Sequence, residues 1–234
     1  MRKLILIAFI LFTHYSNAQA ALFALIFGDK VATENFNVGL EAGLPFSSIE
    51  NTADTSIKAG ITFGIAGNIK LNDHWSVHPT AYFLSRRGGK FDALSLNSND
   101  LELNAKFQNV STELTVSYID VPVFVNYRFT DSPFKIGIAP QISFRTGSQA
   151  IFSNEQGDFE ASVKDVTNSI DLGMIVQAGY VYYNKKFDKE IHIQLRYFQG
   201  FNDIYDESFV AGSNRSNYFG LALSLPFVAK PEKE

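Results

Sequence analysis

Apolar and polar residues alternate along most of this chain with a period of two, which is the pattern of a β-strand with two unlike faces. Between Ile57 and Lys70, residues such as Ile61 and Ile65 form an apolar face, while Gly, Ala, Thr and Lys form the opposite face. The alternation recurs in seven further runs, at about 36–44, 75–83, 117–129, 134–145, 170–182, 191–197 and 218–227. The pattern therefore predicts eight strands.

The polar face of these strands is rich in glycine, alanine and charged residues, whereas the other face is almost entirely apolar. A soluble sandwich would show water a face rich in Lys, Glu and Thr. Small residues alternating with large ones are expected inside a narrow barrel, whose interior is filled by side chains. We therefore expect the apolar face to meet lipid and the small and charged face to line the barrel interior.

The links between the runs alternate in length. Three links are short, at 71–74, 130–133 and 184–190, and four are longer and polar, at roughly 47–56, 88–113, 147–169 and 203–217. Short turns at one end and long loops at the other are typical of bacterial outer-membrane barrels, and an even strand number closes the sheet without an edge in lipid. The prediction is all-β: an eight-stranded antiparallel up-and-down transmembrane β-barrel with short periplasmic turns and long extracellular loops.

Composition agrees with this fold. The 22 phenylalanines and 10 tyrosines favour strands. Mean hydropathy is −0.02, as expected when only every second residue of a strand meets lipid. The chain has no cysteine, which excludes disulfides and a lipoprotein anchor, and its net charge of −4 forms no basic face for nucleic acid.

The first residues have the layout of a secretory signal peptide. Arg2 and Lys3 precede an apolar run that is too short to span a membrane, and small residues follow it. We expect a signal peptide at 1–18, with cleavage after Ala18 or alternatively after Ala20. A periplasmic segment at 19–33 that could form a short helix, or be left over from an extended signal peptide, would precede a barrel at 34–228 and a tail at 229–234.

Several charged residues point to the inferred interior. We expect five of them to form a charge network there: Glu41, Asp120, Arg145, Asp171 and Arg196. Four more are candidates to join it: Lys58, Lys70, Arg86 and Arg128. Because isolated charges are costly in a low dielectric, the expected role is a buried ion-pair network that locks the barrel. The alternative is a polar passage with selectivity set by these charges, although eight strands usually enclose no open channel.

Aromatic residues gather toward the predicted strand ends. Trp75, Tyr127, Tyr182 and Tyr197 are predicted to belong to the interfacial girdle of a membrane barrel. The alternative explanation is plain strand propensity.

Catalysis and metal binding have weak candidates. His192 with Asp171 could form a general-base pair, but none of the histidines sits in a Ser- or Asp-bearing catalytic motif. A set of oxygen-bearing residues in the second long link could bind calcium: Asp92, Asn97, Asn99, Asp100 and Glu102. These lack the regular spacing of a calcium loop. We expect no catalytic residue, no cofactor and no metal.

Several motifs carry a family resemblance. They are Asn-Asp-His-Trp-Ser-Val-His-Pro at 72–79, Tyr-Ile-Asp-Val-Pro at 118–122, Lys-Ile-Gly-Ile-Ala-Pro-Gln at 135–141, and Asp-Leu-Gly at 171–173. The chain resembles the Bacteroidota-type outer-membrane β-barrel families, including the PorT-like barrels. The family pattern often has an acidic residue where this chain has Thr80. The resemblance implies a shared architecture more than a shared activity, with a best-known branch tied to type IX secretion and gliding.

The expected function is that of an integral outer-membrane protein with a structural, adhesive or assembly/secretion-related role. Its partners would be outer-membrane lipid and secretion or assembly components, not nucleic acid, and the protein would be a monomer. Three alternatives remain at this point. They are a narrow porin-like barrel passing small solutes, a lipid-modifying or proteolytic barrel, and a soluble lipocalin-type barrel with apolar side chains inside.

Overall fold

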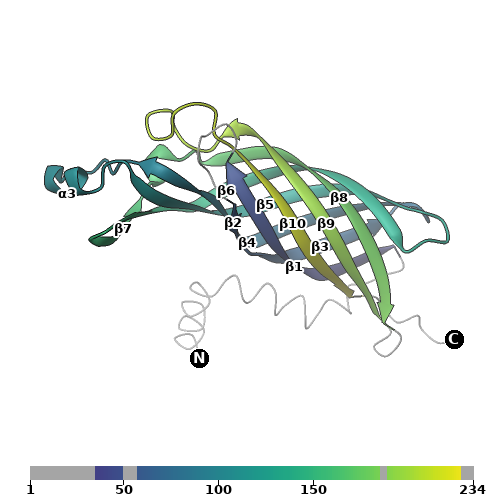
Figure 1. The fold of residues 1–234 in the computed structure, drawn as a ribbon. Helices are drawn as coiled ribbons and strands as arrows, with labels where there is room; N and C mark the ends of the chain where they lie inside the picture. Colours follow the sequence, from purple (N-terminus) through teal and green to yellow (C-terminus); the bar gives the residue numbers. More distant parts are fainter. Residues whose placement is uncertain (1–34, 50–56, 185–188, 228–234) are drawn as a thin grey trace, which may run out of the picture.

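The computed structural model describes residues 35–49, 57–184 and 189–227, most of which form one antiparallel sheet that closes into a ring (Figure 1). The strands are β1 (Phe36–Ile49), β2 (Lys58–Ala59), β3 (Thr62–Lys70), β4 (Trp75–Leu94), β5 (Val110–Arg128), β6 (Phe134–Asn154), β7 (Gly157–Ser162), β8 (Ile170–Asn184), β9 (Lys189–Asp203) and β10 (Arg215–Phe227). Two short helices lie between strands, α3 (Leu101–Lys106) and a 3-10 helix, η1 (Lys164–Val166).

Eight strands make the wall of the barrel. Neighbours in sequence pair in antiparallel fashion, and β10 pairs with β1 from Val38↔Phe227 to Ile49↔Ser216, which closes the ring. Strands β2 and β3 pair with β1 in one continuous register and so act as one interrupted wall strand, while β7 pairs with β6 and lies off the ring. The predicted eight-stranded up-and-down barrel is confirmed.

The two faces of the wall have the predicted character. Ile61, Val123 and Leu223 lie on the outside with 38–45% of their surface exposed. Glu41 and Asp120 lie inside and are almost completely buried. A lipocalin-type barrel would have the opposite arrangement, so that alternative is wrong. No helix in the described ranges is long and apolar enough to cross a membrane.

The two ends of the barrel differ. The short connections at 71–74 and 129–133 lie at one end, called here the turn end. At the other end, the extended end, the outer parts of β4 and β5 with α3, and of β6 with β7, project beyond the ring (Figure 1). We call this projection, residues 88–117 and 147–162, the extension. The prediction of loops at 88–113 and 147–169 is wrong in part, because β4 continues to Leu94, β5 begins at Val110, and β6 and β7 fill most of 147–162.

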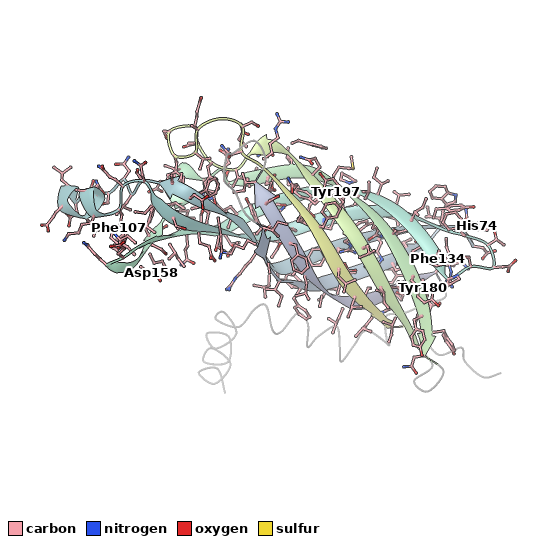
Figure 2. The ribbon with its side chains drawn as sticks, viewed as in Figure 1. His74, Phe107, Phe134, Asp158, Tyr180 and Tyr197 are labelled. Atoms are coloured by element: carbon pink, nitrogen blue, oxygen red, sulfur yellow. The ribbon has the colours of Figure 1, made fainter. Side chains whose placement is uncertain are left out.

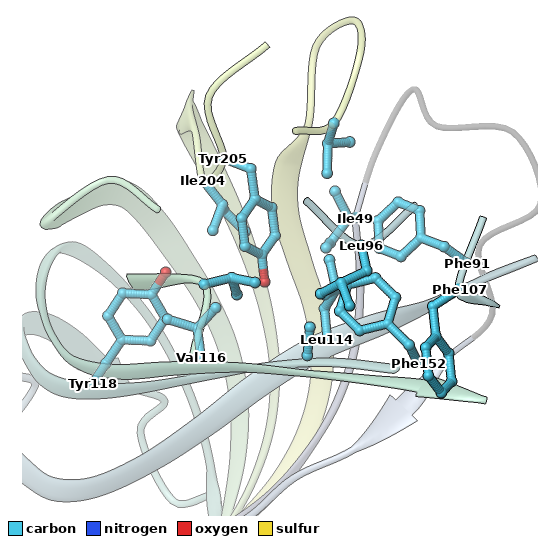
Figure 3. Packing of buried hydrophobic residues seen from close by; sticks show 13 residues of the cluster. Ile49, Phe91, Leu96, Phe107, Leu114, Val116, Tyr118, Phe152, Ile204 and Tyr205 are labelled. Atoms are coloured by element: carbon cyan, nitrogen blue, oxygen red, sulfur yellow. The ribbon is translucent and has the colours of Figure 1, made fainter. Parts of the chain in front are cut away.

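The extension has its own apolar core. Its inward side chains form a cluster with residues of the β9–β10 loop (Figure 3). The buried members are Ile49, Phe91, Leu96, Phe107, Leu114, Val116, Tyr118, Ala150, Phe152, Val163, Ile204, Tyr205 and Val210. The interior of the wall holds buried polar residues together with a second, smaller apolar cluster, and it becomes apolar at the extended end.

Three register shifts in β4 and β6 change which residues face inward, and one of them, between Phe91 and Leu94, lies in the extension. The β4–β5 register shifts by one residue between Tyr82 and Ser85, so β4 carries one extra residue there. The β5–β6 register shifts between Ser117 and Tyr118, opposite Gly147 and Arg145. Each shift is a β-bulge, which reverses the side-chain alternation beyond it.

Candidate functional site

The first polar cluster of the interior is centred on Glu41 and Arg196. Arg196 Nη1 lies 2.6 Å from Glu41 Oε1. The Tyr82 hydroxyl donates a hydrogen bond to Glu41 and accepts one from Arg196. Arg196 also donates to Gln177 Oε1 at 3.0 Å and to Gln194 Oε1 at 2.9 Å. This buried pair is held by bonds from several strands and ties them together.

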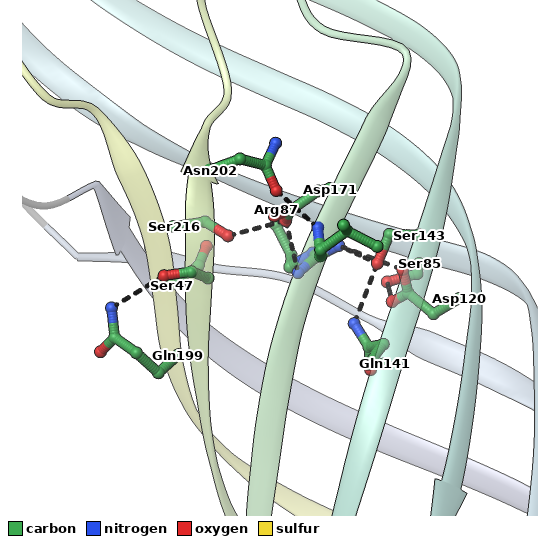
Figure 4. Close-up of polar contacts among 12 residues, drawn as sticks. Ser47, Ser85, Arg87, Asp120, Gln141, Ser143, Asp171, Gln199, Asn202 and Ser216 are labelled. Carbon is green, nitrogen blue, oxygen red and sulfur yellow. Dashed lines mark hydrogen bonds and ion pairs between the residues drawn. The ribbon is translucent and has the colours of Figure 1, made fainter.

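The second cluster is centred on Arg87 (Figure 4). Its Nη2 lies 3.0 Å from Asp120 Oδ1 and its Nη1 lies 3.3 Å from Asp171 Oδ2. Ser85 donates to Asp120 at 2.5 Å, and Ser216 donates to Asp171 at 3.0 Å. The arginine joins β4 to both β5 and β8 across the barrel interior.

Aromatic rings surround both guanidinium groups. Arg87 Cζ lies 4.3 Å from the ring centre of Tyr118 and 4.8 Å from that of Phe198. Arg196 Cζ lies 4.6 Å from the ring centre of Phe124. Cations are attracted to ring faces at such distances, so the rings partly replace the water that burial removes.

Four of the five predicted network residues take part in these two clusters: Glu41, Asp120, Asp171 and Arg196. Sequence reasoning missed Arg87 and proposed its neighbour Arg86, which is exposed. The bulge between Tyr82 and Ser85 explains the error, since it moves odd-numbered residues to the inside of β4 from Ser85 to Phe91. Counting back from inward-facing Phe91 would have found Arg87.

Arg145 lies apart from both clusters. It sits at the β6 irregularity opposite Tyr118. Among the described residues, its Nε and Nη1 atoms are buried without a hydrogen-bond partner. The structure therefore does not bring Arg145 into the network that the sequence predicted for it.

The remaining charged candidates have local partners. Lys58 lies 2.5 Å from Glu113 at the extended end. Lys70 pairs with Asp73 in a turn, and Arg128 pairs with Glu190. Lys58 lies at the extended end of the barrel, and Lys70 and Arg128 lie at the turn end, so none of the three is in the middle.

The structure separates the candidate pair His192 and Asp171. His192 contacts Lys135 at 3.0 Å and Glu190 at 3.0 Å. It pairs with Val181 on β8, ten residues from Asp171 along that strand, which corresponds to about 33 Å of strand. The two residues lie at opposite ends of the barrel.

The interior is filled by side chains. Arg87, Tyr118, Phe124 and Phe198 are each at most 2% exposed and occupy its cross-section. A hollow lined by Tyr82, Arg196 and Tyr218, among others, has a volume of about 10 Å³, room for roughly one water. In the described part of the chain, side chains therefore occupy this cross-section of the interior.

The β9–β10 loop closes the extended end. Asn214 Oδ1 accepts hydrogen bonds from the backbone N–H groups of Ile204 and Tyr205, and its Nδ2 donates to the carbonyls of Tyr205, Val210 and Gly212. These bonds hold Ile204, Tyr205 and Val210 in the apolar core. Burial there raises the pKa of the Tyr205 hydroxyl, which therefore stays protonated.

Three of the four predicted girdle residues lie toward the turn end. The rings of Trp75 and Tyr127 are 5.0 Å apart, and Tyr182 is half exposed and pairs with Ile191. Figure 2 places His74, Phe134 and Tyr180 at the same end. Tyr197 lies farther along β9 against Phe219, with ring centres 4.7 Å apart. A girdle at the turn end stays a prediction.

The calcium candidates do not converge. Asp100 Oδ1 accepts from Leu103 N–H at 3.0 Å and caps α3, and Glu102 lies 2.9 Å from Lys106. The hydrogen bond and charge of Lys106 lower the pKa of Glu102. Within the described ranges, no three His, Cys, Asp or Glu side chains form a group suited to a metal ion.

Several solved structures resemble the chain at low sequence identity, among them one of an outer membrane protein. The chain is 15% identical to neisserial surface protein A (81% of this chain, 96% of that chain, TM-score 0.40). It is 12% identical to Ail, the attachment invasion locus protein of Yersinia pestis (83% and 100%, TM-score 0.44), and 10% identical to OprG from Pseudomonas aeruginosa (82% and 93%, TM-score 0.38). Similarities of this size carry no information about activity.

The sequence itself places the chain in a family. No curated protein sequence matches it significantly. The model of the outer membrane protein beta-barrel domain family matches residues 17–206, which is most of the chain. The chain therefore belongs to the outer membrane protein beta-barrel domain family and is an integral protein of the cell outer membrane.

Proposed function

We propose that this protein is a non-conducting, non-enzymatic anchor that holds the extension at the cell surface for contact with a macromolecular partner. The observation that carries the proposal is the separate apolar core of the extension, in which Leu114, Ala150 and Phe152 are completely buried. A loop needed only to connect two strands would require no such core. Rigid projection beyond the lipid favours recognition by this part of the chain.

The extended end is proposed to face the outside of the cell. Bacterial barrels have short turns in the periplasm and their longer connections outside. The short connections at 71–74 and 129–133 support this orientation. The expected partners are therefore lipid around the wall and a macromolecule above it.

Two observations weigh against the alternatives. Solute passage is opposed by the filled interior, in which Arg87 and Phe198 are buried in the middle of the barrel. A proteolytic or lipid-modifying activity is opposed by the separation of His192 from Asp171. Neither alternative is favoured by a specific contact in the described residues.

Planar-bilayer recording of the purified full chain tests the closed interior. The expected result is no stepwise conductance, with the Asn214→Ala variant as a probe of the loop that covers the extended end. Stepwise currents from the unmodified chain would contradict the proposal and support the porin-like alternative.

Attachment of cells that carry the protein tests the role of the extension. Replacing residues 91–112 by an Asn-Gly turn removes the β4–α3–β5 tip while leaving the wall strands. The expected result is loss of attachment with unchanged heat-modifiable migration of the barrel on gels. Equal attachment by both chains would contradict a binding role for this part of the extension.

We also propose, from the motifs at 72–79, 118–122 and 135–141, that the chain is a PorT-like barrel of Bacteroidota type acting as a monomer with secretion or assembly components. The test is cross-linking in the native membrane followed by identification of the linked proteins. Links only to copies of this chain would contradict both the monomer and the assembly role.

A further inference from the structure

We propose that β7 is a docking edge to which an extended polypeptide with alternating apolar and basic residues adds as a further strand. The proposal rests on the proposed function only in placing β7 outside the cell. In the described residues β7 pairs with β6 alone, so its second edge has no strand partner. Figure 1 shows it at the far end of the extension.

The register identifies the backbone groups on the free edge. Asn154 and Gly157 flank a two-residue turn and pair with each other, so Gly157, Phe159 and Ala161 bond to β6 in the alternating pattern of an antiparallel ladder. The next residue in this series, Val163, donates its N–H to the Ser148 carbonyl at 3.2 Å, as the same alternation requires. The N–H and C=O groups of the intervening residues therefore point away from β6. These residues are Asp158, Glu160 and Ser162.

The side chains define what an added strand must look like. Phe159 and Ala161 pack against the apolar core, yet each is only partly buried, whereas Phe152 opposite Phe159 is completely buried. An added strand with apolar residues on this face would cover Phe159, since residues opposite each other share a face. Figure 2 places Asp158 beside the tip that also carries Phe107, whose ring centre lies 5.6 Å from that of Phe159.

The opposite face of β7 is acidic. Asp158 and Glu160 are exposed and belong to the residues whose backbone groups face the free edge. Lysine or arginine in the added strand would lie directly opposite these carboxylates, which favours pairing. A second copy of β7 would instead bring acidic residues together, so a basic partner is favoured over self-association.

Strand addition derives its affinity from main-chain hydrogen bonds and its specificity from alternate side chains. A probe that carries both features is a seven-residue peptide of alternating valine and lysine. The matched control peptide has glutamate in place of lysine. Binding is measured to the full chain in detergent micelles or nanodiscs, with hydrogen exchange of the backbone amides recorded by NMR.

The expected result is binding of the lysine peptide with slowed exchange at the amides of Asp158, Glu160 and Ser162. Glu160→Pro removes the N–H that faces the free edge but no bond to β6, and is expected to weaken binding by at least about tenfold. Glu160→Gln keeps the N–H and is expected to weaken binding about two- to fivefold at low salt, as for an exposed ion pair. The control Glu207→Gln, in the exposed β9–β10 loop, is expected to change nothing.

Unchanged binding to Glu160→Pro would overturn the proposal, as would equal binding of the glutamate peptide, amide protection elsewhere than β7, or dimers joined through β7. A lysine peptide methylated on alternating backbone nitrogens, which cannot complete the ladder, tests the same point without altering the protein. Its failure to bind is expected, and binding as tight as that of the parent peptide would overturn the proposal. Conductance in bilayers would contradict the proposed function alone. The docking proposal would still be decided by whether the peptide protects the amides of the β7 edge.

Discussion

Strand β5 passes through two regions of the molecule in which its faces have opposite character. In the barrel wall, Val123 faces outward and Asp120 faces inward, whereas in the extension Glu113 faces outward and Leu114 faces inward. Hydrocarbon excludes charged groups, and water excludes apolar surface. Along β5 the same set of residues faces inward throughout. The outward side chains change from apolar in the wall to polar in the extension, and this change marks the boundary between lipid and water.

The largest expected effect comes from removing one partner of the ion pair in the barrel. Glu41→Ala leaves Arg196 buried without its carboxylate and is expected to lower the free energy of unfolding by about 3–5 kcal/mol. Urea unfolding in detergent micelles measures this. The control is the double variant Glu41→Leu with Arg196→Met, which removes both charges and is expected to recover part of the loss. An equally stable single variant would mean that water fills the interior.

An arginine on the outer face of β6 is expected to cost stability in the wall but not in the extension. Ile138→Arg, in the wall, is expected to cost about 2–4 kcal/mol because the side chain would enter hydrocarbon. Gln149→Arg, on the same outer face in the extension, is expected to change stability by less than about 0.5 kcal/mol. Refolding into lipid vesicles followed by chemical denaturation measures both. Equal costs at the two positions would place the boundary elsewhere.

The apolar core of the extension is expected to unfold separately from the barrel. Leu114→Ala leaves a cavity and is expected to cost about 2 kcal/mol of local stability. The readout is faster proteolysis of the extension with unchanged heat-modifiable migration of the barrel. Val123→Ala, on the lipid side of the same strand, is the control and should leave proteolysis unchanged. Loss of the whole barrel in Leu114→Ala would show that the two regions fold as one unit.

The smallest expected effect concerns α3 at the tip. The hydrogen bond and charge of Lys106 lower the pKa of Glu102, so the ionised carboxylate is favoured in the folded state. Its contribution is present above the pKa of an unfolded glutamate and is lost as pH falls through the lowered value. Lys106→Gln is expected to move the pKa of Glu102 back toward its ordinary range, measured by NMR titration. An identical titration in both proteins would rule out the pair.

The wall of the barrel was predictable because lipid imposes one simple rule on every strand. Period-two alternation located all eight wall strands and placed Glu41, Asp120, Asp171 and Arg196 inside. These predictions needed only local sequence, since side-chain direction in a regular strand follows from position alone.

The remainder depended on irregular or long-range features. Arg87 was missed because one extra residue in β4 reverses the alternation, and Arg145 was misplaced at the β6 irregularity. The extension was interpreted as loops because its outward residues are polar, as water requires. Lys135 and His192 lie on different strands, and their contact depends on how those strands are aligned. Alternation within one strand does not specify that alignment.

The extra residue of β4 also makes that strand tolerant of a change in length. Deleting Leu84 would remove the bulge and restore regular alternation along this part of β4, and Ser85 and Arg87 would still face the interior. Deleting Val176 from β8, whose ladders run without a shift, would turn over one half of the strand and drive Asp171 or Gln177 into the bilayer. In an alignment of homologous chains, single-residue insertions and deletions are therefore expected beside Leu84 and are expected to be rare in β8.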